Sequence, residues 1–539
     1  MLSIYARPLR NIPVLFVQVS KYNISMENKV YKNASIVTGL SVAERGLGFL
    51  YRVVLSRLIG AEGLGLYQVA LSLFSLFLTV GTGGIPITVS RMISKCKANG
   101  DTAGERRVVG AGLCACLLLT LPVALLLAIF GKNFTFLFSD SRCFNLFKIL
   151  LIGLCFSSIY AVLRGSFWGN KEFLLPSIVE IAEETVMVIA GVLLLQNVSS
   201  PLNGAEKAVW AVVLSYLFSF SLAILLFFLR GYKISKPKKE LKSLFTSSLP
   251  ITSVRAGGSL INSAIAVLLP VMLIRSGMGE SDAFALFGVL SGMVLPLLFI
   301  PSTLIGSLSL VLVPELSEDY YRGNYTHLYT NLRRGIKFSF LIACAILPFF
   351  FTLGYDLGAL AFSNLTAGEM ISYSAPILLP MSLTMITTSM LNSLGFEKQT
   401  FLVYFFSAAI LLLCVLLLPA LCGGYAYLIG LGASFSVNAL CNFLFLLKKC
   451  PLYQNRGKQV FLREFLPHLL AVLPLSLLGY FTHGLLARFF STPLALFTTT
   501  FVLLLATCAL YFVTGALRFE ALKKFLPAKR RERRKTGDF

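Results

Sequence analysis

The chain has 539 residues, of which 56% are hydrophobic and only 13% are charged. This composition excludes a soluble globular protein and predicts a chain that lies largely within a membrane. The net charge is +23, but the basic residues border apolar stretches and no aromatic-rich soluble domain accompanies them, so we do not expect nucleic-acid binding.

Residues 1–30 precede the first long apolar stretch. Arg7 and Arg10, followed by a short apolar run from Ile12 to Val19, resemble a weak signal segment, but no small-residue cleavage site follows. We expect residues 1–30 to be a disordered extension. The sequence that begins at Met26 reads like an ordinary bacterial start, so an upstream start site is a second explanation for residues 1–25.

About fourteen apolar stretches are long enough to cross a hydrocarbon core of about 30 Å as helices. They lie at residues 36–59, 66–90, 108–130, 145–168, 173–196, 208–229, 247–274, 284–313, 334–353, 373–394, 399–419, 424–447, 464–487 and 493–516. The predicted fold class is therefore an all-α polytopic membrane protein.

Lysine and arginine residues collect in alternate connections and in the tail at 517–539. Because positively charged loops stay in the cytoplasm, this pattern predicts an even number of spans with both termini cytoplasmic. We expect the basic linker at 233–246 and the basic tail to touch anionic membrane lipids. The predicted localisation is the bacterial cytoplasmic membrane.

A few charged side chains interrupt the apolar stretches. Glu44, Arg45 and Arg52 lie within 36–59, and Arg255 lies within 247–274. A charge at the centre of a bilayer costs roughly 2.5–3.5 kcal/mol, so such residues normally face a watery cavity or an opposite charge. We predict a cavity that attracts an anion. Alternatively, Arg52 pairs with Glu44 or reaches the interface, and Arg255 lies near the cytoplasmic boundary.

Three glutamates share one face of the stretch 173–196, because Glu180, Glu183 and Glu184 are three and four residues apart. Three explanations stay open: they bind a proton or cation such as Na⁺, they pair with the arginines, or they lie at the membrane interface. The three histidines are far apart in sequence and no pair of cysteines has metal-ligand spacing, so we expect no metal site. We expect no cofactor, and the chain has no phosphate-binding loop for ATP.

An internal repeat divides the chain. Residues 65–94 resemble residues 286–317, and residues 164–171 resemble residues 391–398. Two such halves predict two pseudo-symmetric six-helix lobes around a central cavity, at 31–232 and 247–450, followed by two additional spans within 451–516. Glycine and proline residues within the spans are candidate hinges, with close helix packing as the alternative explanation. The candidates are Gly83, Gly84, Pro86, Gly306 and Pro314.

One long motif resembles a known family. The sequence Ala43-Glu44-Arg45-Gly46-Leu47-Gly48-Phe49-Leu50-Tyr51-Arg52 and its continuation through Tyr67 are similar to the first span and loop of the stage V sporulation protein B group. The resemblance extends to Gly83-Gly84-Ile85-Pro86, to Leu249-Pro250-Ile251-Thr252 with Arg255, and to the turn at 391–395. This group shares a superfamily, known as MOP, with polysaccharide exporters, the MurJ lipid II flippases and the MATE drug exporters.

The resemblance implies a cavity that opens alternately to either side of the membrane. It also implies that Arg45, Arg52 and Arg255 bind the pyrophosphate of an undecaprenyl-linked sugar precursor, with Glu44 beside them. The last two spans would form a groove for the lipid tail. Some members of the superfamily hold sodium in the second lobe, but the stretch 399–419 has no carboxylate. Asn262 and Asn392, elsewhere in the predicted second lobe, remain as neutral candidates for binding an ion.

The function that follows is a monomeric flippase for a lipid-linked cell-wall precursor, with lipid II favoured, and not an enzyme. Cell-wall synthesis enzymes are candidate partners. The alternatives are an exporter of another lipid-linked polysaccharide unit, a MATE-type multidrug exporter and a non-transporting scaffold. The arginines argue against a carrier of cationic drugs and the glutamate cluster argues for one, whereas a scaffold would tolerate loss of Arg45 or Arg255.

Overall fold

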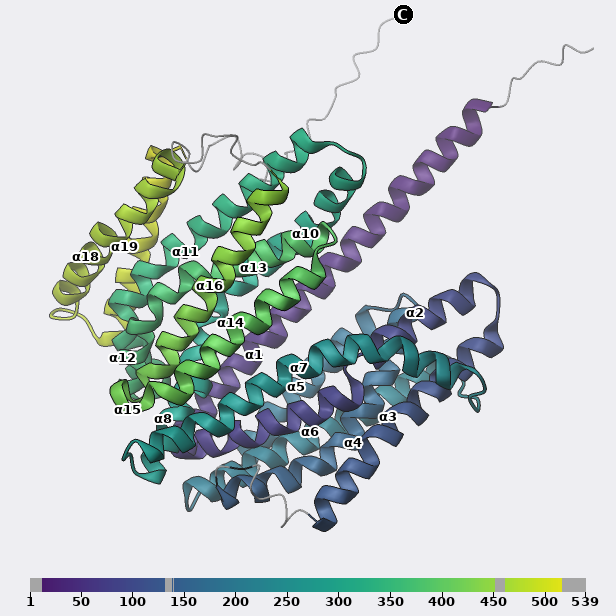
Figure 1. Ribbon diagram of the computed structural model, residues 1–539, viewed down its shortest axis with the longest axis horizontal. Helices are drawn as coiled ribbons and strands as arrows, with labels where there is room; N and C mark the ends of the chain where they lie inside the picture. The colour runs from purple at the N-terminus through teal and green to yellow at the C-terminus, as the bar shows by residue number, and fades with distance from the viewer. Residues whose placement is uncertain (1–11, 131–137, 139, 451–460, 516–539) are drawn as a thin grey trace, which may run out of the picture. The chain divides into compact units, whose positions relative to one another are not determined.

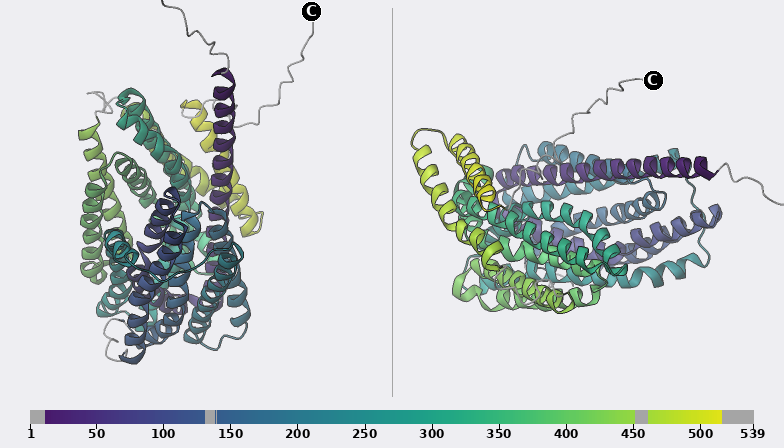
Figure 2. Two further views of the ribbon diagram at one scale, coloured as in Figure 1. Left: turned by 90° about the vertical axis from the view of Figure 1, so that its right-hand side faces the viewer. Right: turned by 90° about the horizontal axis from the view of Figure 1, so that it is seen from above.

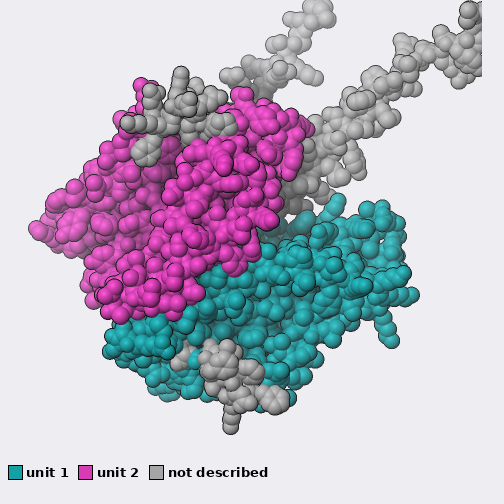
Figure 3. Space-filling view, in the orientation of Figure 1, with its two compact units in different colours: residues 1–288 teal, residues 289–539 magenta. Residues whose placement is uncertain are grey.

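The computed structural model describes residues 12–130, 138, 140–450 and 461–515. All regular elements in this part of the chain are helices, so the predicted all-α class is confirmed. The chain forms two compact units, 1–288 and 289–539, which Figure 3 shows in two colours. The basic tail at 517–539 lies outside the described residues.

Unit 1 contains eight labelled helices (Figure 1). They are α1 Ile12–Thr82, α2 Ile85–Ala98, α3 Thr102–Phe130, α4 Ser141–Gly169, α5 Leu174–Leu194, α6 Pro201–Leu229, α7 Glu240–Arg275 and α8 Glu280–Gly288. The predicted lobe boundary at 233–246 differs from the division between the units. The reason is that α7 packs against α1, α2 and α3, so both α7 and α8 belong to unit 1.

Unit 2 begins with a π-helical segment and contains the remaining helices. They are η2 Val289–Val294, α9 Leu295–Leu298, α10 Ile300–Tyr321, α11 Tyr325–Phe362, α12 Leu365–Ser374, η3 Ala375–Ile377, α13 Leu378–Ser393, α14 Glu397–Leu417, α15 Pro419–Cys422, α16 Tyr425–Lys449, η4 Phe461–Phe465, α18 Leu466–Leu486 and α19 Thr492–Val513. Within this unit, α18 and α19 pack against each other and against α11.

Helix α1 is two helices joined at Gly60. This residue has φ 72° and ψ 179°, a conformation that glycine adopts without a steric cost. Tyr51 and Arg52 before the break both interact electrostatically with Tyr67 after it. Arg52 lies eight residues before Gly60 and Tyr67 lies seven residues after it. Two residues this far from the break can interact only if the chain reverses, so the second helix runs back along the first.

The sequence analysis expected a disordered extension over residues 1–30, whereas the structure continues α1 back to Ile12 as a helix (Figures 1 and 2). Pro13 stands at its start, and no proline or glycine occurs between Pro13 and Gly39. The stretch therefore contains nothing that would interrupt a helix. Residues 1–11 lie outside the described residues.

Twelve candidate membrane spans are found among the described residues, so the predicted count of fourteen is close but not confirmed. Two features account for the difference. One candidate, Gly39–Ala98, is 60 residues long and contains residues 39–59 of the first predicted stretch and all of the second, 66–90. Helix α5 is absent from the twelve because its three glutamates interrupt an otherwise apolar segment.

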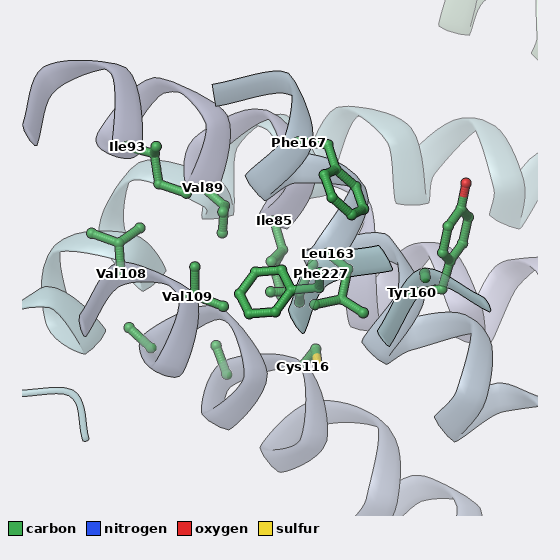
Figure 4. Close-up of a cluster of buried hydrophobic side chains, with 14 of the residues drawn as sticks. Ile85, Val89, Ile93, Val108, Val109, Cys116, Tyr160, Leu163, Phe167 and Phe227 are labelled. Carbon is green, nitrogen blue, oxygen red and sulfur yellow. The ribbon is translucent and has the colours of Figure 1, made fainter. Parts of the chain in front are cut away.

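The core of unit 1 that positions these helices lies between α2, α3, α4 and α6 (Figure 4). Val89, Val108, Leu163 and Phe227, one from each helix, are all at most 1% exposed. Helix α4 approaches α2 closely because Gly165 has no side chain: a Cβ there would lie 2.5 Å from the carbonyl oxygen of Pro86. This packing fixes the rotation of α4.

The turns after α4 and α13 are alike, as the internal repeat predicts. Each helix is followed by one cap residue and then by a residue with positive φ, which is Lys171 (63°) after α4 and Gly395 (84°) after α13. The sequence comparison aligned Lys171 with Lys398. The backbone instead aligns Lys171 with Gly395, three residues earlier, because the turn and not the lysine is the repeated feature.

Candidate functional site

Charged side chains from three helices of unit 1 meet around α5. Its glutamates share one face, and each reaches a different neighbouring helix. Arg164 on α4 donates through Nη1 to Glu180 Oε1 at 3.0 Å, and Glu183 lies within hydrogen-bonding distance of Ser219 on α6. Glu184 lies against α1, where a Cβ on Gly48 would be 2.7 Å from its Oε1.

Helix α1 supplies the other members of this group. Glu44 interacts electrostatically with Glu180, Arg45 and Arg164, and Arg52 interacts with Glu184. The predicted residues of α1 and α5 therefore lie together. We call this group the charged cluster, and its members are Glu44, Arg45, Arg52, Arg164, Glu180, Glu183 and Glu184.

The sequence analysis missed Arg164 as a member of the cluster. Its guanidinium carbon lies 5.1 Å from the ring centroid of Trp168 and 5.8 Å from that of Tyr160. These three residues recur at intervals of four, so they share one face of α4. An arginine within the apolar stretch 145–168 was the available signal, but the sequence analysis used this residue only as part of the internal repeat.

The charged cluster is not cationic. With every group ionised, its four carboxylates exceed its three guanidinium groups by one negative charge. The Glu180–Arg164 pair gives part of the glutamate face an ionic partner, although with an arginine that we did not predict. Because the three glutamates point toward three different helices, they do not converge on a single point.

Arg255 contacts the junction between α1 and α2. Its Nη1 donates to the carbonyl oxygen of Gly83 at 3.0 Å, directly after the end of α1, where carbonyl groups lack helical partners and attract positive charge. Thr252 Oγ1, one turn earlier on α7, accepts from the backbone N–H of Gly84 at 2.9 Å. The contact holds Arg255 against this junction, and its role in binding pyrophosphate stays a prediction.

The predicted hinges occupy two different environments. Gly83 and Gly84 form the connection before α2, and Pro86 lies in the first turn of that helix. A Cβ on Gly84 would lie 2.4 Å from the carbonyl oxygen of Ser248 on α7, so close packing requires this glycine. Gly306 and Pro314 lie inside α10, and a Cβ on Gly306 would meet no atom within 4 Å.

The two neutral candidates for ion coupling lie apart from the charged cluster in sequence. Asn262 is an exposed residue of α7. Asn392 near the end of α13 accepts a hydrogen bond from Thr400 Oγ1 on α14 at 2.7 Å, so it already joins two helices of unit 2. Coupling to sodium or protons stays a prediction.

Comparison with known proteins identifies the family. Residues 30–319 match the model of the polysaccharide biosynthesis protein family. The chain belongs to this family. The matched segment contains all members of the charged cluster, and the resemblance stated from the sequence is confirmed.

Two proteins of Bacillus subtilis (strain 168) are similar to the chain. Stage V sporulation protein B is 26% identical over 363 residues, which cover 65% of this chain and 70% of that protein. Lipid II flippase MurJ is 22% identical over 428 residues, which cover 73% of this chain and 78% of that protein.

Solved structures show that this family member has the fold of MOP superfamily transporters. Lipid II flippase MurJ in an inward closed conformation matches with a TM-score of 0.65 at 15% identity, covering 90% of this chain and 99% of that one. An inward-facing multidrug resistance MATE family transporter matches with a TM-score of 0.61 at 16% identity, covering 77% and 96%. The chain is therefore a multi-pass membrane protein.

Proposed function

We propose that the chain is a flippase that moves an undecaprenyl-pyrophosphate-linked cell-wall precursor, with lipid II favoured, across the bacterial cytoplasmic membrane. One observation carries the proposal: a cluster of ionisable side chains lies on helices of a chain related to a lipid II flippase over 73% of its length. Charged groups at such positions are costly and mark substrate or ion paths.

Transport would proceed by alternating access, with no covalent step and no cofactor. Arg45, Arg52 and Arg255 would hold the pyrophosphate, because a guanidinium group binds two phosphate oxygens at once. A proton or Na⁺ near Glu180, Glu183 and Glu184 would balance the excess negative charge of the cluster. Gly83, Gly84, Pro86, Gly306 and Pro314 are the proposed hinges, and the working form would be a monomer.

The surroundings of the protein complete the proposal. Both termini would lie in the cytoplasm, where the basic linker and tail face anionic lipid head groups. The product reaches the outer leaflet, so the enzymes that polymerise the cell wall are its expected consumers and candidate partners.

Export of cationic drugs is a second candidate function. The excess carboxylate of the charged cluster favours it, because a cationic ligand would restore neutrality. The larger share of the chain that matches the MurJ structure, 90% against 77% for the MATE transporter, supports the flippase architecture.

Complementation tests the proposal. Cells depleted of their lipid II flippase would express the wild-type chain or one of three variants, Arg45→Ala, Arg52→Ala or Arg255→Ala. Arg106→Ala, at an exposed site on α3, is the matched control. We expect growth with the wild type and the control, and loss of growth with the three variants at equal membrane levels.

Two results would contradict the flippase. Wild-type protein that inserts normally without restoring growth would exclude lipid II as the substrate. If the same cells also became resistant to cationic dyes, drug export would replace the proposed function.

A further inference from the structure

One face of α4 combines aromatic rings with an ion pair. Tyr160, Arg164 and Trp168 lie along this face, and Glu180 of α5 accepts a hydrogen bond from Arg164 at 3.0 Å. The Arg164 and Glu180 side chains are 30% and 23% exposed, so both keep accessible surface. Trp168 is half-buried, whereas Tyr160 is only 6% exposed and donates its hydroxyl to the carbonyl oxygen of Pro176 at 3.4 Å, so Trp168 is the ring that keeps accessible surface. Of these residues only Glu180 has a proposed role, in ion coupling.

The chemistry of this face matches a sugar ring. A hydroxyl group both donates and accepts hydrogen bonds, so it can bind a guanidinium group and a carboxylate that lie side by side. The C–H faces of a pyranose carry weak positive charge and stack on the negative face of an aromatic ring.

The charges around the Arg164–Glu180 pair favour an uncharged sugar over a phosphate as its ligand. Four carboxylates and three guanidinium groups make up the charged cluster, and Glu44 interacts with both Arg164 and Glu180. The guanidinium group of Arg164 already binds Glu180, so a doubly charged pyrophosphate placed on this pair would be repelled by the carboxylates of Glu180 and Glu44. An uncharged saccharide meets no such repulsion and uses the carboxylates as acceptors.

We infer that Arg164 and Trp168 on α4, together with Glu180, form the saccharide subsite for the lipid-linked substrate, with the buried Tyr160 ring packed against Arg164. This inference rests on the proposed flippase function. It adds that unit 1 recognises the sugar through α4 and α5, separately from the arginines proposed to hold the pyrophosphate.

Tryptophan fluorescence of the purified full chain tests the subsite directly. The sequence has only two tryptophans, Trp168 and Trp210, and Trp210 is 42% exposed on α6. The Trp210→Phe variant therefore reports on Trp168 alone. The probes are N-acetylglucosamine, its β-1,4-linked disaccharide and inorganic pyrophosphate. We expect a saturable change in emission with the two sugars and no change with pyrophosphate.

Variants in the Trp210→Phe background identify the groups that bind. Glu180→Gln removes the charged acceptor and should weaken sugar binding about tenfold, the loss expected for one hydrogen bond to a charged group. Arg164→Lys retains the positive charge but loses the planar set of guanidinium N–H donors, so it should weaken sugar binding by a similar factor. Glu172→Gln is the control, because Glu172 pairs with Arg230 at 3.7 Å outside the cluster, and its sugar affinity should equal that of the parent.

Several results would overturn the subsite. Emission of Trp168 that is unchanged by the sugars, or that responds to pyrophosphate alone, excludes a saccharide subsite here. Equal sugar affinity in Glu180→Gln, Arg164→Lys and the parent would do the same.

A separate assay of lipid II movement across proteoliposomes distinguishes the two ideas. If the wild type transports lipid II but Trp168 emission does not respond to sugars, the flippase proposal is supported and the saccharide subsite is excluded. If the chain moves no lipid-linked precursor but its Trp168 emission responds to sugars, and this response weakens in Glu180→Gln, the saccharide subsite is supported and the flippase function is excluded.

Discussion

At the scale of single residues, Gly48 determines how closely α1 approaches the glutamates of α5. A Cβ built on Gly48 would lie 2.7 Å from Glu184 Oε1, whereas one built on Gly46 would meet no atom within 4 Å. Glu184 in turn interacts electrostatically with Arg52 and Glu44. A methyl group at Gly48 would therefore displace a carboxylate at the centre of the charged cluster.

The Gly48→Ala variant should reduce transport of the lipid-linked precursor roughly tenfold, an increase of about 1.4 kcal/mol in the barrier. The displaced atom is the end of a flexible side chain, so the fold should survive. Transport into proteoliposomes and the thermal midpoint of the purified protein are the two measurements.

Gly46→Ala is the control, because it adds the same methyl group two residues away in the same helix. Both variants gain about 0.8–1 kcal/mol of intrinsic helix propensity, so neither should melt below the wild type. Equal transport by the two variants would show that the position of the Glu184 carboxylate does not matter.

The sequence predicted part of this cluster and not the rest, for a physical reason. Spacing alone placed Glu180, Glu183 and Glu184 on one face, and hydropathy placed Glu44 and Arg52 inside a span. Which helices adjoin that face depends on tertiary packing between distant segments. For that reason the pairing of Glu180 with Arg164, and the contact of Arg255 with Gly83, were visible only in the structure.

At the scale of helices, α18 and α19 are fastened to α11 within unit 2. Tyr511 on α19 donates its hydroxyl to the carbonyl oxygen of Leu341 at 2.6 Å, and His483 on α18 lies 2.9 Å from Asp356. Glu464, just before α18, pairs with Arg333 at 3.3 Å and with Lys337 at 3.4 Å. The sequence predicted both helices from their hydropathy but gave no sign of these anchors.

Removal of one anchor should loosen the helix pair. Tyr511→Phe deletes a hydrogen bond from an 8% exposed side chain, which typically costs about 1 kcal/mol. Amide hydrogen exchange in α19 should then rise about fivefold, because local opening becomes easier by that amount. Mass spectrometry of the exchanged protein measures the effect peptide by peptide.

Tyr480→Phe removes the same hydroxyl from a side chain of α18 that is 69% exposed, so its exchange should match the wild type. Equal exchange in the two variants would mean that apolar packing against α11, rather than the Tyr511 hydroxyl, holds the pair.

At the scale of the whole molecule, the chain passes from unit 1 to unit 2 inside an apolar segment. The stretch Glu280–Gly306 is one candidate membrane span, yet the units divide at Gly288. Glycines fasten α8 to α1 within unit 1, since a Cβ on Gly65 would lie 2.0 Å from the carbonyl oxygen of Phe284. Directly afterward, η2 packs against α12 of unit 2. Sequence reasoning treated 284–313 as one ordinary span, because hydropathy does not distinguish π-helical from α-helical turns.

The π-helical segment Val289–Val294 is therefore the expected pivot for motion of one unit against the other. A π-helical turn contains one residue more than the α-helix would need, and such turns occur frequently at functional sites.

Deletion of Gly292 should let the helix close with α-helical hydrogen bonds and stiffen the connection. We expect normal membrane insertion but transport slowed about tenfold. Met293→Leu, which conserves volume and the number of residues, should transport like the wild type. A Gly292 deletion that transports at the wild-type rate would place the pivot elsewhere, and the hinges proposed at Gly83 and Gly306 would be the next positions to test.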